Sequence, residues 1–275
     1  MIIGNKEFDT NNNVYVMGIL NVTPDSFSDG SRYNSMDKAL KHAEDMINEG
    51  ADIIDIGGES TRPGHIQISE QEEIVRVAPI IEAIKKEYDV PVSIDTYKAS
   101  VALESFKAGA DLLNDIWGLL YENNYVDGVN LIAKYAKEYD VAVCLMHNDV
   151  TQMSENNMDI VINRLNKSVE EALKYGINKD KIITDPGIGF AKSYENNLYV
   201  MKHLDSLNKM GYPVLLGTSR KSMIGLATGE EVNNRVEGTI ATIVYGVEKG
   251  VSFVRVHDVK ENLRAIKMTQ AILNA

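Results

Sequence analysis

Two carboxylates and an amide stand out among the side chains that can do chemistry. Asp95, Asn114 and Asp185 each lie at the end of a short apolar run of the kind that forms a buried strand. A carboxylate pairs well with the parallel N–H donors of a guanidine-like edge. When such pairing is buried it gives specificity, because a ligand without the donors leaves protein groups unpaired. These side chains indicate a deep pocket for a flat, donor-rich heterocycle.

A second set of side chains carries positive charge or polar ligand atoms. Its members are Asn21, Arg62, Lys221, Arg255 and His257. Lys221 lies in the run GTSRKSMIG (217–225), which is typical of the start of a helix, and helix N-termini attract anions. The set indicates a site for phosphate groups and their Mg²⁺.

An activated nucleophile is missing from the sequence. There is no Gly-x-Ser-x-Gly elbow, no His-Glu-x-x-His and no histidine cluster with zinc spacing. Cys144, the only cysteine, lies within the run VAVCLM, where we expect a buried and inert thiol. No lysine ends the sixth apolar run, which argues against a Schiff-base aldolase. The sequence instead indicates transfer between two bound substrates, which the protein positions while it stabilises charge.

Eight short apolar runs ending in polar residues alternate with helical stretches. The runs are 14–21, 52–58, 90–96, 111–116, 141–147, 181–187, 213–219 and 252–258. This pattern in a chain of 275 residues predicts an α/β fold, a single-domain (β/α)8 TIM barrel over residues 1–275. A doubly wound sheet is the second choice, because the sequence lacks a dinucleotide-binding glycine fingerprint.

The stretches between the runs have helical periodicity. Residues 35–50 place five apolar side chains on one stripe, namely Ala39, Leu40, Ala43, Met46 and Ile47. Residues 69–88 begin with Ser69 and have Glu72 three positions later, which predicts a capping box.

The barrel prediction also places the polar residues. Active sites of such barrels lie at the carboxyl ends of the strands, so the residues that end the eight runs should converge on one mouth. Asp52 and Asp111, in repeated Gly-Ala-Asp entries to strands, are expected at the opposite end as turn residues. The stretches 21–30 and 57–64 follow strands and are punctuated by Gly and Pro, which favours mobile lids over the mouth. Ordinary surface loops are the alternative.

Composition narrows the class of protein. A net charge of −12 argues against an electrostatic surface for nucleic acid or anionic membranes. One cysteine allows no intramolecular disulfide, and no apolar stretch approaches the ~20 residues of a membrane span. The N-terminus lacks the pattern of a signal peptide. We therefore expect a cytoplasmic protein.

Several motifs of the sequence are distinctive in combination, namely MGILNVTPDSFSDG, IDIGGESTRPG, SIDTYKASVA, LLNDIWGL, DPGIGFAK, LLGTSRKSMIG and VRVHDV. Taken together they resemble the dihydropteroate synthase family, a folate-biosynthesis family that sulfonamides target. The resemblance covers about residues 14–272. It implies a homodimeric (β/α)8 barrel that joins 6-hydroxymethyl-7,8-dihydropterin pyrophosphate to p-aminobenzoate. The implied products are 7,8-dihydropteroate and pyrophosphate, and the implied cofactor is Mg²⁺.

The resemblance also implies roles for the residues that match the family's motifs. Pterin would be bound by Asp95, Asn114, Asp185, Lys221 and Arg255. Pyrophosphate would be bound by Asn21, Arg62, Arg255 and His257, with Asn21 also on the metal. The p-aminobenzoate site would include Phe27, Thr61, Pro63, Phe190, Lys221 and Ser222. The residues expected to take part in catalysis are Asp25, Arg62, Asp95 and Lys221.

The chemistry of the two substrates agrees with this set. An aniline nitrogen is a weak nucleophile because its lone pair is delocalised into the ring. Attack is easier once pyrophosphate has left and a resonance-stabilised pterin methylene cation has formed, whose charge Asp95 can offset. Lids that exclude water would protect this cation from hydrolysis. No protein nucleophile is needed.

Two other functions compete with this hypothesis. A pterin-binding methyltransferase domain would share the barrel and the Asp/Asn set, but would not need the TPDSFSDG and STRPG loops or the RVHD ending. A non-catalytic pterin-binding paralogue would be expected to have lost Arg62, Asp95, Lys221 or His257, and the sequence has all four.

Overall fold

A closed barrel of parallel strands forms the centre of the computed structural model, which describes residues 1–22, 32–60 and 66–275. The eight strands are β3 (Tyr15–Asn21), β4 (Ile53–Gly57), β5 (Val92–Asp95), β6 (Leu112–Asp115), β9 (Ala142–Met146), β10 (Ile182–Asp185), β11 (Leu215–Leu216) and β12 (Phe253–Val256). They pair in the order β10-β9-β6-β5-β4-β3-β12-β11, and a parallel bridge between Thr184 and Val214 closes the ring. Each strand lies within one of the predicted runs, so the barrel prediction is confirmed.

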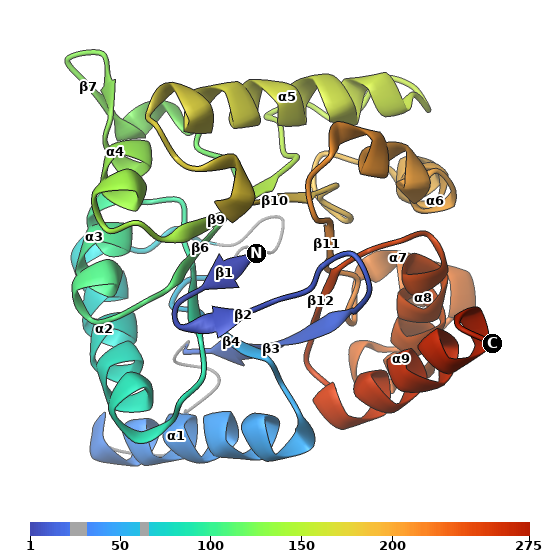
Figure 1. Ribbon diagram of the computed structural model, residues 1–275, viewed down its shortest axis with the longest axis horizontal. Coiled ribbons are helices and arrows are strands. Elements are labelled where there is room, and N and C mark those ends of the chain that lie inside the picture. The colour runs from blue at the N-terminus through green and yellow to red at the C-terminus, as the bar shows by residue number, and fades with distance from the viewer. Residues whose placement is uncertain (23–31, 61–65) are drawn as a thin grey trace.

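Helices surround this barrel (Figure 1). They are α1 (Arg32–Glu49), α2 (Glu70–Glu87), α3 (Ala99–Lys107), α4 (Leu131–Glu138), α5 (Met158–Lys174), α6 (Tyr194–Lys202), α7 (Ser222–Thr228), α8 (Val236–Glu248) and α9 (Val259–Leu273). The predicted stripe of α1 is confirmed, since Ala39, Ala43 and Met46 are buried. A two-stranded hairpin, β7 (Tyr125–Val126) and β8 (Val129–Asn130), lies between β6 and α4.

The start of α2 differs in one detail from its prediction. The Ser69 hydroxyl accepts a hydrogen bond from the Glu72 backbone N–H at 3.1 Å, as an N-cap should. The Glu72 carboxylate pairs with Arg76 instead of returning to Ser69. The capping box was therefore half right. The helix with a complete box is α6, where Ser193 and Asn196 bond reciprocally.

Residue type alternates along the barrel strands, because successive side chains of a strand point to opposite faces. Outward positions such as Ile54 and Ile56 of β4 join the large apolar core beneath the helices. Inward positions near the amino ends form a separate apolar cluster that includes Ile53, Leu112 and Phe253. Two residues further along, the same inward register reaches Asp55, Asn114 and Arg255. The barrel interior is thus apolar in its lower layer and polar above it.

The N-terminal hairpin of β1 (Ile2–Ile3) and β2 (Lys6–Glu7) seals the apolar end of the barrel. Figure 1 shows it lying across that end. Phe8 follows it and is 1% exposed, with its ring 4.8 Å from Tyr15 and 5.7 Å from Phe253 between centroids. Ile3 joins the same cluster. No role for this N-terminal hairpin or for Phe8 was predicted from the sequence.

Asp52 and Asp111 lie at this same end, as predicted, but they are more than turn residues. Asp52 accepts the backbone N–H of Val16 at 2.9 Å, and Asp111 accepts that of Val92 at 2.8 Å. Each carboxylate also pairs with a lysine, Lys6 at 3.0 Å for Asp52 and Lys85 at 2.8 Å for Asp111. The repeated Gly-Ala-Asp entry therefore binds the amino end of a neighbouring strand.

Phe8 fills the apolar end of the barrel, so we expect its truncation to destabilise the protein without changing the site at the carboxyl ends of the strands. We expect Phe8→Ala to lower the free energy of unfolding by about 3–5 kcal/mol, because it leaves a cavity among Ile3, Tyr15 and Phe253. Urea denaturation followed by circular dichroism measures this, with Phe8→Leu as the milder control. A midpoint equal to that of the unsubstituted protein would show that the hairpin does not stabilise the barrel.

Candidate active site

A buried guanidinium lies at the carboxyl ends of the strands. Arg255 on β12 donates from Nε to Asp55 Oδ2 at 2.6 Å and from Nη2 to Asp95 Oδ2 at 2.7 Å. Asp55 is fully buried and Asp95 is 6% exposed. The two carboxylates raise the pKa of Arg255 against the effect of its burial. This triad joins β12, β4 and β5 across the barrel mouth.

Asp55 accepts several hydrogen bonds that no pattern in the sequence predicted. Besides Arg255, it accepts from the Ser93 hydroxyl and from Asn114 Nδ2 at 3.3 Å. Neither Asp55 nor Ser93 was predicted from the sequence to belong to the site. Period two along β4 is the signal that could have found Asp55, because it places this residue in register with the inward-facing Ile53. Asp55 therefore orients two residues that were predicted to bind the heterocycle.

Asp95 keeps one oxygen available for a ligand. Its Oδ2 is bound to Arg255, while the buried Oδ1 has no hydrogen-bond partner within residues 1–22, 32–60 and 66–275. Burial raises the pKa of Asp95 to about 7, although Arg255 acts in the opposite direction. A buried acceptor without a partner is costly, so it points to a bound molecule that donates a hydrogen bond.

Asp185 and Lys221 form a second charged pair of the site. Burial raises the pKa of Asp185, and Lys221 and the Gly187 N–H, which donates to Oδ1 at 2.6 Å, oppose the shift. Burial lowers the pKa of Lys221 to about 8, with Asp185 opposing. The Lys221 ammonium lies 4.5 Å from the centroid of the Phe190 ring and donates to the Ile188 carbonyl. Asp185, Lys221 and Phe190 thus share one side of the mouth.

The segment that carries Lys221 is held to the segment after β12. The Ser219 hydroxyl lies 2.9 Å from His257 Nδ1. Arg220 makes two hydrogen bonds to Asp258, at 2.6 and 3.2 Å, and adopts a left-handed φ of 57°. A non-glycine residue rarely holds this conformation without support, which the ion pair supplies here. Ser219 and Arg220, which precede Lys221, are therefore held beside His257 and Asp258.

A buried charge cluster joins the chain on both sides of residues 61–65. Glu59 accepts from the Ile68 N–H at 2.8 Å, the Tyr97 hydroxyl at 2.8 Å and Lys98 Nζ at 2.7 Å. Lys98 also donates to the Ile68 carbonyl and to Glu73, both at 2.8 Å. Residues 59 and 68 are thereby anchored to one another beside β5.

The structure brings together most of the predicted site residues. Asp95, Asn114 and Arg255 are linked through Asp55, and Lys221 interacts electrostatically with Asp185, Arg255 and Asp95. His257 follows directly after β12. Asn21 ends β3 opposite Gly57, and Ser222 begins α7. Asp25, Phe27, Thr61, Arg62 and Pro63 lie outside the described residues. Cys144 is buried, as predicted.

Metal ligands are sparse in the described part of the chain. Across residues 1–22, 32–60 and 66–275, no three His, Cys, Asp or Glu side chains form a group that could hold a metal ion. Asn21 offers an amide oxygen at a strand end, a hard ligand of the type that Mg²⁺ accepts. This donor set fits a Mg²⁺ bound chiefly by water and substrate phosphates.

Across residues 1–22, 32–60 and 66–275, none of the helices has the length and apolar character needed to cross a membrane.

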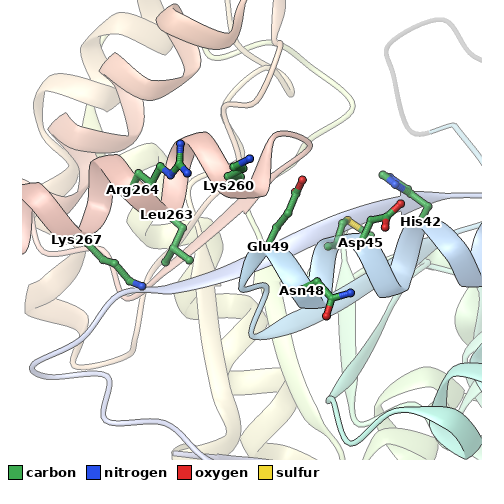
Figure 2. Close-up of a pocket in the computed structure, with 9 residues that line it drawn as sticks. His42, Asp45, Asn48, Glu49, Lys260, Leu263, Arg264 and Lys267 are labelled. Atoms are coloured by element: carbon green, nitrogen blue, oxygen red, sulfur yellow. The ribbon is translucent and has the colours of Figure 1, made fainter.

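A hollow of about 600 Å³ lies between α1 and α9, away from these residues (Figure 2). Asp45 and Glu49 line one wall, and Lys260, Arg264 and Lys267 line the other. These charged side chains are exposed, and none belongs to the predicted set. The buried polar layer at the strand ends is the better candidate for chemistry.

Comparisons with known proteins agree with this geometry. Residues 17–257 match the family described as pterin binding enzyme. The chain is 54% identical over 274 residues to dihydropteroate synthase of Clostridium beijerinckii, covering 99% of both chains. A crystal structure of the Clostridium difficile enzyme in the presence of pteroic acid is 49% identical, with a TM-score of 0.92 over 98% of this chain and 100% of that one. The Xanthomonas albilineans enzyme with 4-aminobenzoic acid is 36% identical, with a TM-score of 0.89 over 96% and 94%.

These matches span nearly the full length of the chain and of its relatives, and the identities are too high for a shared fold alone. The chain belongs to the pterin binding enzymes and, within them, to the dihydropteroate synthases.

Proposed function

We propose that this protein condenses 6-hydroxymethyl-7,8-dihydropterin pyrophosphate with p-aminobenzoate to give 7,8-dihydropteroate and pyrophosphate. The observation that carries the proposal is the buried set of Asp95, Asn114 and Asp185 around Arg255, with Asp95 Oδ1 unpartnered within the described ranges. A pterin supplies the N–H donors that such a set lacks. The relatives support the second substrate, since one is described with 4-aminobenzoic acid.

In this proposal the pterin lies over the polar layer of the barrel. Asp95, Asn114 and Asp185 accept and donate hydrogen bonds along its edge, while Lys221 and Arg255 hold its remaining polar atoms and its ring. Loss of pyrophosphate leaves a cationic methylene on the pterin. The Asp95 carboxylate offsets this charge at no cost of reorganisation, because Arg255 already fixes its other oxygen.

The leaving pyrophosphate is held by the remaining polar residues of the mouth. Asn21, Arg255 and His257 provide described groups for it, and Arg62 is proposed to join them from the resemblance. We propose that Mg²⁺ is required, with Asn21 as a ligand. When bound, Mg²⁺ would neutralise charge on the pyrophosphate oxygens.

The amine substrate enters beside Lys221. Phe190 provides an aromatic surface under the Lys221 ammonium, and Ser222 begins α7 next to it. Phe27, Thr61 and Pro63 complete the proposed p-aminobenzoate site, and Asp25 is proposed to act near the reacting centre; these roles come from the resemblance. The aniline nitrogen attacks the methylene and then loses its proton to solvent.

We propose that the enzyme acts as a homodimer in the cytoplasm. The support for the dimer is α8, an apolar helix on which Val244 and Tyr245 remain partly exposed.

The proposed function has a direct test. Purified protein is given the pterin pyrophosphate and Mg²⁺, with and without p-aminobenzoate, and pyrophosphate release is measured. We expect release that depends on p-aminobenzoate and forms pteroate in equal amount. Release that does not increase when p-aminobenzoate is added, or no release at all, would contradict the proposal.

The charged pairs predict a bell-shaped pH dependence of kcat/KM. Because the pKa of Asp95 is about 7, its carboxylate is protonated below that pH and the rate should rise as it ionises. Because the pKa of Lys221 is about 8, its ammonium is lost at higher pH and the rate should fall. Asp95→Asn should remove the acid limb and lower kcat/KM by about 10²-fold. Lys221→Met should remove the alkaline limb; an unchanged profile in both variants would refute the assignments.

Asp55 should matter for catalysis although it was not predicted from the sequence. In Asp55→Asn, the partner of Arg255 Nε loses its charge, so the guanidinium and Asn114 lose their fixed positions. We expect kcat/KM to fall by about 10²-fold with a retained fold. Circular dichroism controls for folding. Ser93→Ala is the matched control, since it removes only one neutral bond to the same carboxylate and should cost far less.

A further inference from the structure

Two lysines hold the backbone between β10 and α6. Lys192 Nζ donates to the carbonyls of Gly187 at 3.0 Å and Phe190 at 3.1 Å. Lys221 Nζ donates to the carbonyl of Ile188. Lys221 faces the proposed substrates, whereas Lys192 is 9% exposed and its ammonium binds protein groups. The stretch 187–190, which carries the Phe190 ring, is therefore fixed from two sides.

The third hydrogen bond of Lys192 goes to His147. The Lys192 ammonium lies 2.7 Å from His147 Nδ1, and His147 is 1% exposed at the end of β9. Burial lowers the pKa of Lys192 to about 7, although Asp185 opposes the shift, so Nζ can either donate to Nδ1 or accept from it, according to the tautomer of the ring. Burial and the nearby Lys192 lower the pKa of His147 to about 3, which keeps the imidazole neutral. Lys192 Nζ thereby has three hydrogen-bond partners.

The backbone that Lys192 holds requires glycine at one position and has a rare conformation at another. Gly187 has a φ of 66°, and a Cβ placed there would lie 2.0 Å from the His147 carbonyl oxygen. Ala191 has a φ of 47°, which is rare for a residue with a side chain. Its carbonyl accepts the Met153 N–H at 2.8 Å. Glycine adopts its φ without strain. The rare conformation of Ala191 persists only where neighbouring bonds fix it, and Lys192 supplies one such bond through the carbonyl of Phe190, which precedes Ala191.

We propose that Lys192, held by His147, is a positioning residue that fixes the Phe190 wall and thereby sets the affinity for p-aminobenzoate. The inference rests on the proposed function, which places that substrate against Phe190. Lys192 acts through the backbone of residues 187–190 and not on the reacting atoms. The part of the pterin site formed by Asp55, Asp95 and Arg255 makes no contact with Lys192. Asp185 is nearer, because its Oδ1 accepts the Gly187 N–H at 2.6 Å, so the expected effect on pterin binding is the smaller of the two.

Lys192→Met separates the two sides, because methionine keeps most of the length and removes every donor. We expect the KM for p-aminobenzoate to rise about 10-fold or more while the KM for the pterin pyrophosphate stays within about 2-fold. Lys167→Met, on the exposed face of α5, is the matched control and should change neither value. Equal changes in both KM values for Lys192→Met, or no change, would overturn the inference.

Two substitutions of His147 test the contact between His147 and Lys192 without altering the lysine. His147→Asn keeps an amide that can donate a hydrogen bond to Lys192 or accept one from it, whereas His147→Leu does not. We expect His147→Leu to reproduce the selective rise in the KM for p-aminobenzoate and His147→Asn to stay within about 3-fold of the unsubstituted protein. If Lys192→Met does not fold, this pair decides.

Equal effects of Asn and Leu at position 147 would contradict the inference. So would a failure of both Lys192→Met and His147→Leu to fold, because the pair would then support the whole barrel and not one wall. An unsubstituted protein without p-aminobenzoate-dependent turnover would instead refute the proposed function. The two failures are therefore distinguishable.

Discussion

The ion pairs of Arg255 with Asp55 and Asp95 are the constraint on which the site depends. Their partners are separated by 200 and 160 residues in the chain, so they connect strands that only the closed barrel brings together. Burying three charged groups costs several kcal/mol each unless the geometry of the bonds is good. Here every polar atom of Asp55 is used, and Asp95 retains one free oxygen within the described ranges. The triad therefore fixes the direction from which a ligand can complete the site.

A buried triad of charges contributes little to the free energy of folding, so the barrel must be stabilised by other contacts. The lower interior layer supplies it, with Ile53, Leu112 and Phe253 packed under the plug of Ile3 and Phe8. Outside the strands, a large apolar core joins them to the helices. Apolar burial thus stabilises one end of the barrel, which leaves the other end to hold charges at a cost. This division follows from the period of two along each strand, because one inward position is apolar and the next is polar.

Local patterns predicted much of this architecture, and long-range pairings were the part they could not reach. The eight strands, the stripe of α1 and the convergence of Asp95, Asn114 and Asp185 follow from periodicity and from the rule for barrel mouths. Asp55 was missed because its role depends on Arg255, and no spacing rule connects residues on β4 and β12. Lys192 was missed for the same reason, since it appears unremarkable in its own segment. His147, which ends the fifth run, was expected at the mouth, but its bond to Lys192 could not be predicted. The capping box predicted for α2 failed in part because of a similar competition. Arg76 lies one turn beyond Glu72 and pairs with the carboxylate that was expected to bond the Ser69 backbone.

The charges of the mouth explain why this site suits a dissociative transfer. Asp55 and Asp95 share the single guanidinium of Arg255, which leaves one negative charge in excess among these three groups. Burial raises the pKa of Asp95, Arg255 opposes this shift and the Asp55 charge adds to it, so the excess is unfavourable. A neutral pterin leaves the imbalance in place, whereas a pterin methylene cation removes it. The site therefore binds the charge-developing state better than the ground state, and only such a difference accelerates the chemical step.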